Sequence, residues 1–200
     1  MKKCLMLLFA LSLALGVRAD ERSSRILEHV AAAFRAMNAY EVEFEVDADG
    51  HHTEGGYAVV GDAYYLRLGS AEVFADAAQR YEVDHQRREV TINPLSPASH
   101  NILDNPAHVF DYWGDQYTAS LIAETATQAR ILLVPRDAID PAAERVTLSV
   151  DLATYRPLML EYDYDGDRIV VRITAVSKTA NPLPAFDRKA VKDYEMIDFR

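Results

Sequence analysis

Apolar positions recur at two different periods along the chain, and each period predicts one kind of element. After a capping serine, Ser23 or Ser24, apolar residues recur every three to four positions. This spacing predicts an amphipathic helix that ends at Asn38. From Tyr40 the period changes to two, with valine and phenylalanine facing one way and glutamate the other. A half-buried strand is therefore expected over 40–46. The helical stripe consists of Ile26, Leu27, Val30, Phe34 and Met37.

Strands with short connections make up most of the remaining chain. Turn sequences such as Asp49-Gly50 and Gly61-Asp62 separate the first of them, and connections this short exclude parallel pairing through crossover helices. Asn105-Pro106 predicts the start of a short helix that reaches Trp113, and a helical turn is expected near 188–192. The expected strands cover 56–60, 63–68, 72–75, 79–83, 89–93, 118–124, 129–134, 145–150, 157–164, 168–178 and 194–199.

The fold class predicted from this pattern is mainly β, with one long antiparallel sheet of about 9–11 strands. A sheet of that size curls or closes, which shields its edges. The helical stripes at 26–37 and 109–113 can cover its inward face, either as an ordinary core or as the cap of a cavity for an apolar guest, and the pattern leaves both readings open. The inward face is expected to carry Val42, Phe44, Val46, Leu66, Leu68, Val90, Ile92, Leu158, Leu160, Ile169, Val171 and Ile173.

The first 19 residues predict a cleaved secretory signal. Lys2 and Lys3 precede an apolar run over 4–16 that is shorter than the roughly 20 residues a membrane-spanning helix needs. Val17-Arg18-Ala19 then places small residues where a signal peptidase reads them, so cleavage is expected between Ala19 and Asp20. Residues 20–200 are expected to form a single exported, soluble domain.

Charge and cysteine content exclude several classes of protein. The formal net charge is −10, and loss of three cations and no acids with the signal moves it to −13. Proteins that bind nucleic acid or anionic membranes need a basic surface, so both classes are disfavoured. The single cysteine, Cys4, lies inside the signal. Disulfides, thiolate catalysis and sulfur-ligated metals are therefore excluded in the mature chain.

Motif searches find no catalytic or metal-binding constellation. The histidines at 29, 51, 52, 85, 100 and 108 lack zinc-like spacing, and no nucleophile motif or phosphate loop is present. The acidic stretch 163–167 resembles a calcium loop, but Arg168 and Thr174 stand where glycine and glutamate are needed, so it predicts an exposed hairpin tip. We therefore expect no enzyme and no cofactor.

Several local strings, in this order and spacing, resemble the periplasmic lipoprotein carrier family (LolA-like), particularly its Bacteroidota form. The resemblance covers essentially the whole mature chain. Three features depart from the family pattern: Asp76-Ala77 replaces Asp-Gly, Tyr81 replaces tryptophan, and Gly61 stands where relatives carry an arginine that latches a helical lid. No latch residue is therefore transferred. The matching strings are Ile26-Leu27 with Phe44, Gly55-Gly56-Tyr57, Gly61-Asp62-Ala63-Tyr64, Tyr81-Glu82-Val83, Glu89-Val90-Thr91-Ile92, Asn105-Pro106, Leu132-Leu133-Val134-Pro135 and Tyr194-Glu195-Met196-Ile197-Asp198-Phe199-Arg200.

The resemblance implies an unclosed antiparallel barrel whose helices cover an apolar cavity. It implies a periplasmic carrier that binds the acyl chains of lipoproteins, or a lipid, and shuttles them to the outer membrane. Such a monomer would meet acylated lipoproteins or lipids, an inner-membrane release machinery and an outer-membrane acceptor, and no nucleic acid. A lipid or lipoprotein sensor of the same fold in an envelope regulatory complex, and an exported enzyme, are the alternatives. With this cavity, strand parity and the helical stripes predict a lining of Phe34, Phe44, Leu66, Val90, Ile92, Phe110, Trp113, Leu160 and Val171.

Overall fold

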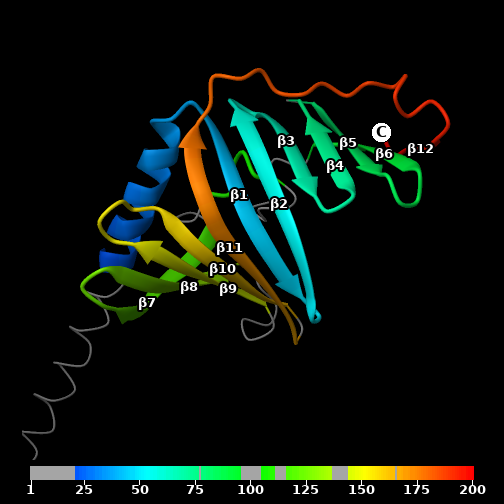
Figure 1. The fold of residues 1–200 in the computed structure, drawn as a ribbon. Coiled ribbons are helices and arrows are strands. Elements are labelled where there is room, and N and C mark those ends of the chain that lie inside the picture. Colours follow the sequence, from blue (N-terminus) through cyan, green and yellow to red (C-terminus); the bar gives the residue numbers. More distant parts are fainter. Residues whose placement is uncertain (1–20, 77, 96–104, 111–115, 137–143, 165) are drawn as a thin grey trace, which may run out of the picture. The chain divides into compact units, whose positions relative to one another are not determined.

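The computed structural model describes residues 21–76, 78–95, 105–110, 116–136, 144–164 and 166–200. They form twelve strands and an N-terminal helix over 21–35 (Figure 1). The mainly β fold is therefore confirmed. Each of the twelve strands overlaps one of the expected ranges, and all twelve belong to the sheet, for which about 9–11 strands were expected. The chain divides into two compact units: unit 1 is Met1–Ala33 with Trp113–Arg168, and unit 2 is Phe34–Tyr112 with Ile169–Arg200. The prediction of a single domain stays a prediction.

Unit 2 contains a meander of six strands, flanked by two strands from the end of the chain. The hydrogen-bonded order is β12-β6-β5-β4-β3-β2-β1-β11, and its two end strands do not pair with each other in the described residues. All pairs are antiparallel except β12 with β6, because the chain runs back along unit 2 over 179–194 before it joins β6 (Figure 1). The strands are β1 (Ala39–Ala48), β2 (His51–Val60), β3 (Ala63–Leu68), β4 (Ala71–Ala75), β5 (Gln79–Asp84), β6 (Glu89–Pro94), β11 (Asp167–Lys178), whose residues from Ile169 onward belong to this unit, and β12 (Glu195–Asp198).

β2 begins five residues earlier than the apolar pattern predicted. Asp49 (φ 50°) and Gly50 (φ 75°) both adopt the left-handed conformation that a two-residue hairpin turn of type I′ requires. The ladder therefore starts at once, with Ala48 opposite His51. His51 is exposed, so it does not contribute to the apolar period.

The pairing register divides the side chains of unit 2 between two faces. Directly opposed residues share a face. The side chain of Phe44 lies on what we call the aromatic face. The residues directly opposed to it from strand to strand, and so on the same face, are Gly55, Leu68, Ala71, Asp84 and Glu89. The opposite face carries an apolar cluster beneath the C-terminal segment, formed by Val83, Val90, Ile92 and Val191 with Phe74, Tyr81, Phe186, Tyr194 and Met196 around it.

Aromatic stacking and two turns hold the C-terminal segment on unit 2. The ring of Phe186 stacks on that of Tyr81 with their centroids 4.2 Å apart. Residues 188–193 form turns in which the amide of Ala190 donates to the carbonyl of Asp187 (3.1 Å), as the predicted helical turn implied. Val191 is thereby placed in the apolar cluster.

Unit 1 contains four antiparallel strands, in the order β10-β9-β8-β7, and one face of these strands is apolar. Its strands are β7 (Tyr117–Glu124), β8 (Gln128–Pro135), β9 (Glu144–Asp151) and β10 (Pro157–Tyr164). The predicted helical stripe is buried at Ile26, Leu27 and Val30. The buried residues of the strands are Ala129, Ile131, Leu133, Leu148, Val150 and Leu160.

Ser23 is not the helix cap that the sequence predicted, because the helix already includes residue 21. Its hydroxyl instead donates to the carbonyl of Ala119 in β7, at 3.2 Å, and so ties the helix to the strands of unit 1.

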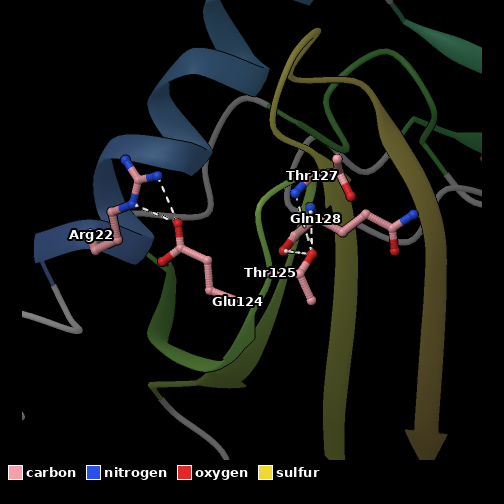
Figure 2. Close-up of polar contacts among 5 residues, drawn as sticks. All are labelled: Arg22, Glu124, Thr125, Thr127 and Gln128. Atoms are coloured by element: carbon pink, nitrogen blue, oxygen red, sulfur yellow. Dashed lines mark hydrogen bonds and ion pairs between the residues drawn. The ribbon is translucent and has the colours of Figure 1, made fainter.

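A second polar contact lies between the start of the helix and the end of β7 (Figure 2). Arg22 donates from Nε (3.2 Å) and Nη2 (2.8 Å) to Oε1 of Glu124. The adjoining turn is ordered by Thr125, whose hydroxyl oxygen accepts from the amides of Thr127 (3.3 Å) and Gln128 (3.0 Å). Since both charged side chains are exposed, the ion pair contributes at most about 1 kcal/mol.

The other face of the unit 1 strands is polar and carries a buried carboxylate. Glu161 of β10 is 5% exposed, and each of its oxygens accepts from a different arginine: Oε2 from Nη2 of Arg130 (2.8 Å) and Oε1 from Nη2 of Arg168. Burial by itself would raise the pKa of Glu161, but the hydrogen bonds from Arg168 and Arg130 lower it below its usual value. Glu161 is therefore ionised at neutral pH.

This shift makes the stability of unit 1 depend on pH. The folded pKa of Glu161 lies below the unfolded value, so its contribution is present above about pH 4.5 and is lost as pH falls through the folded pKa. We expect Glu161→Gln to lower the free energy of unfolding by about 1–3 kcal/mol at pH 7, and by less at pH 3. Urea unfolding at both pH values checks this. An equal loss at both would show that the contribution is not electrostatic.

The predicted short helix after Asn105 is not present over the described residues. Residues 106–110 form turns, with the amide of His108 donating to the carbonyl of Asn105 at 3.2 Å. The remainder of that prediction, up to Trp113, lies outside the described residues. Within the described part of the chain, no helix is long and apolar enough to cross a membrane.

Candidate functional site

Five aromatic rings form a continuous cluster on the aromatic face of unit 2. Phe34, at the end of the helix, stacks on Phe110 with their centroids 4.2 Å apart and meets Tyr40 edge-on at 5.0 Å. Tyr57 joins Tyr40 to Phe44, at 6.2 and 6.0 Å respectively. All five side chains are buried. Pairs of this geometry each add about 0.5–1.5 kcal/mol beyond the burial of apolar area.

A glycine allows Phe44 to lie flat on the sheet. Gly55 is directly opposite Phe44 in the register. A Cβ atom at Gly55 would lie 2.6 Å from Cε2 of Phe44 and 2.9 Å from the carbonyl oxygen of Arg67. The backbone contact cannot be relieved by a side-chain rotation. The glycine is therefore required by the close approach of the phenyl ring.

We expect Gly55→Ala to lower the free energy of unfolding by about 1–3 kcal/mol, because it overpacks the contact with Phe44. The neighbouring Gly56→Ala is the matched control. A Cβ there would meet only the side chain of Glu43, which is about half exposed and can move away. Urea denaturation of both variants tests the difference. A loss in Gly56→Ala as large as in Gly55→Ala would contradict the argument.

The short segment 105–110 packs against the aromatic cluster through Phe110, which stacks on Phe34. Asn105, Val109 and Phe110 are buried, and the hydroxyl of Tyr40 donates a long hydrogen bond (3.4 Å) to the carbonyl of Pro106. This segment takes the covering role that the sequence assigned to a helix.

A cavity of about 190 Å³ borders the cluster beneath this segment. Two of its lining residues approach each other, with Nε2 of His108 3.5 Å from Oδ1 of Asp62. Small-molecule sites commonly measure about 300–1,000 Å³, so this cavity is smaller than a typical ligand site. Its lining consists of Phe34, Arg35, Asn38, Tyr40, Val59, Gly61, Asp62, Ala107 and His108.

A second cavity, of about 300 Å³, lies on the opposite face beneath residues 181–184. Charged side chains line it: Glu41, Glu43 and Arg67, with Nη2 of Arg67 3.9 Å from Oε2 of Glu43. Tyr65 also lines it, and burial together with its hydrogen bond to Glu72 raises the pKa of this phenol to about 12. Both cavities thus have charged side chains in their lining, and the lining of the second is the more apolar of the two.

The structure brings together part of the predicted lining. Phe34 and Phe110 touch, and Phe44, Leu66 and Val171 share the aromatic face. All five are buried, so in this form they line a packed core more than an open cavity.

Val90 and Ile92 do not lie with them, and the expectation of one common face is wrong for these two residues. In each hairpin of the meander an odd-numbered residue is opposite an even-numbered one, so the aromatic face alternates between even and odd positions from strand to strand. On β6 it carries odd positions such as Thr91. Val90 and Ile92 therefore face the C-terminal segment and pack against Val191.

The remaining predicted residues fall elsewhere. Leu160 belongs to unit 1, where it lies opposite Leu148 in the apolar face. Trp113 and the cleavage site at Ala19 and Asp20 lie outside the described residues. Whether any of these residues binds a lipid stays a prediction.

Two aromatic members of the cluster were missing from the predicted lining. Tyr40 shares the two-residue period of Val42 and Phe44, and this signal could have placed it. Tyr57 follows two glycines, which interrupt the apolar alternation, so the pattern does not show which face of the sheet Tyr57 lies on. No group of three or more histidine or acidic side chains that could hold a metal ion occurs in the part of the chain that the structure describes.

Comparison with solved structures finds similar folds at low sequence identity. An uncharacterised conserved protein from Thermus thermophilus has a TM-score of 0.55 and 10% identity, over 88% of this chain and 99% of that one. This similarity concerns the fold alone. No protein-family model and no curated protein matches the chain.

Two further structures carry names from the family that the sequence resembles. A putative outer membrane lipoprotein-sorting protein domain from Vibrio parahaemolyticus has a TM-score of 0.46 and 10% identity, over 86% of this chain and 99% of that one. A LolA superfamily protein from Nitrosomonas europaea has a TM-score of 0.41 and 11% identity, over 80% of this chain and 94% of that one. These names belong to those two proteins, and the Bacteroidota form of the resemblance stays a prediction.

Proposed function

We propose that this protein binds the acyl chains of lipoproteins, or of a lipid, on the aromatic cluster of unit 2 and carries them through the periplasm. The observation that carries the proposal is a buried layer of four aromatic rings, closed by a short segment without helix that adds the ring of Phe110, with a cavity beside it. Each acyl methylene left in water costs about 0.8 kcal/mol, so a lipidated protein needs an apolar surface of this kind to cross an aqueous compartment.

Loading requires segment 105–110 to leave the cluster, because the closed cavity is too small for a long acyl chain. Two polar contacts of this segment with the rest of unit 2 are long: a 3.4 Å hydrogen bond from Tyr40 and a 3.5 Å approach of His108 to Asp62. Replacing Val109 and Phe110 by acyl methylenes exchanges one apolar contact for another. The exchange needs no covalent chemistry, so a carrier needs no catalytic group.

Export through the cleaved signal, a donor at the inner membrane and an acceptor at the outer membrane are parts of the same proposal. We expect the exported protein to begin at Asp20. N-terminal sequencing of the protein from the periplasmic fraction measures this, and an intact Met1 would contradict the proposed location.

The direct test is titration of the purified protein with a fluorescent long-chain fatty acid. Trp113 is the sole tryptophan and follows Phe110 by three residues in the sequence, so its emission can be read without interference from another tryptophan. We expect saturable binding of the probe together with a shift of the Trp113 emission. A wild-type protein that binds no acyl probe would overturn the proposal.

A variant of the covering segment tests the mechanism. Phe110→Ala removes the stack on Phe34 from the closed form only. While the closed form dominates, each 1.4 kcal/mol lost from it raises the open fraction, and hence the apparent affinity, about tenfold. Phe74→Ala is the control, since it removes an aromatic side chain from the opposite face. An equal gain in both variants would indicate general loosening and contradict the mechanism.

A further inference from the structure

The polar face of unit 1 gathers three arginines from three strands. Arg130 of β8 and Arg168 of β11 both bind the buried carboxylate of Glu161. Their side chains are 48% and 62% exposed, whereas that of Glu161 is 7% exposed. The two guanidinium groups are thus held close together while much of each side chain faces solvent.

Arg145 of β9 lies on the same face. In the register it is opposite Asp163, and two residues further along β9 Thr147 is opposite Glu161. Nε of Arg145 is buried and has no hydrogen-bond partner in the described part of the chain. A buried donor without an acceptor is costly, so its occurrence calls for a ligand or a water.

Hydroxyl groups lie between the arginines. Ser149 is opposite Arg130, and Thr147 is opposite Glu161. Both residues are largely buried. Guanidinium groups around a floor of hydroxyl donors suit a ligand with several oxygen acceptors.

We propose that Arg130, Arg145 and Arg168 bind a phosphate group. A guanidinium carries five N–H donors, and Arg130 and Arg168 each use Nη2 for Glu161, which leaves donors for the bidentate contacts that arginine makes with phosphate. Glu161 reduces the entropy lost on binding, because it already orders both side chains.

The face is less acidic than the whole chain. Its three arginines balance Glu161, Asp163 and Asp151, while the chain carries −10, and Oδ1 of Asp151 already accepts from the amides of Ala153 and Thr154. Charges further away than about 10 Å are largely screened at 0.1 M salt, so a bound anion responds mainly to the arginines and carboxylates of this face and little to the charge of the whole chain. The phosphate site does not rest on the acyl-chain proposal, and each can fail without the other.

Isothermal titration of the full chain with inorganic phosphate tests the site. We expect saturable binding that falls about tenfold in Arg168→Gln and in Arg145→Gln, the loss of a charge-assisted hydrogen bond. Arg87→Gln is the control, since Arg87 is 73% exposed and lies in unit 2. Circular dichroism verifies that each variant is folded. No saturable binding by the wild type, or an equal fall in the control, overturns the proposal.

A second arm identifies the source of the phosphate. Vesicles of phosphatidylcholine, with and without phosphatidylglycerol, are sedimented with the wild type and the same variants. Binding to phosphatidylglycerol vesicles that requires Arg145 and Arg168 assigns the site to a lipid headgroup. Binding of inorganic phosphate without such vesicle binding assigns it to a soluble phosphate compound. If binding depends on these arginines in neither arm, the proposed site is rejected.

Discussion

Phe44→Ala is expected to lower the free energy of unfolding by about 3–5 kcal/mol, the usual cost of emptying a packed phenylalanine site. Phe44 is 1% exposed and lies between the backbone at Gly55 and the ring of Tyr57. Neither neighbour can fill the space, since glycine has no side chain and Tyr57 already packs against Tyr40. Urea denaturation followed by circular dichroism measures the loss.

Phe199→Ala is the matched control. This phenylalanine is 65% exposed, so its removal should change stability by no more than about 0.5 kcal/mol. Similar losses in the two variants would refute the packing argument. The same packing predicts that Phe44→Glu unfolds unit 2, because it buries a carboxylate that has no partner. A glutamate at this position therefore cannot separate acyl binding from folding, which is why we test binding at Phe110.

Val191→Asp is expected to release the C-terminal segment from unit 2 and to lower stability by several kcal/mol. Val191 is buried among Val83, Val90 and Ile92, where a carboxylate finds no cationic group in this cluster. Limited proteolysis should cleave the variant within 179–194 faster than the wild type. The urea midpoint should fall in parallel.

Lys192→Asp is the control, because it introduces the same residue one position further on, where the side chain is exposed. We expect its proteolysis pattern to match that of the wild type, and its stability to stay within about 0.5 kcal/mol of the wild-type value. Rapid cleavage of both variants would mean that charge in this segment matters and burial does not.

The sequence predicted the elements of the fold well, because their signals are local. A period of two and short turns identified each strand, and the two-residue period of β1 separated the buried Val42 and Phe44 from the outward glutamates. The helical stripe at Ile26 and Val30 is buried as its spacing required. Where local signals were weak, as in the exposed first half of β2, the predicted boundary moved.

The candidate site was predicted only in part, because alternation within a strand does not say which side of the sheet it faces. Phe44 and Leu66 share a face, but Val90 lies on the other, although all three show the same period. The face on which a side chain lies depends on the register of every hairpin between it and Phe44. A shift of one residue in the register of any of these hairpins moves the side chain to the other face of the sheet.

The sequence by itself thus determined the mainly β fold, the order of its elements and the residues that avoid water, since these follow from periodicity and turn chemistry. Tertiary structure alone decided which of these residues meet. It placed Phe110 on Phe34, enclosed Val90 beneath the C-terminal segment, and joined Arg130 and Arg168 on one carboxylate. Such contacts join residues that are distant in the chain. They depend on the register of several hairpins and on the course of the loops, and neither is visible in the local pattern of the sequence.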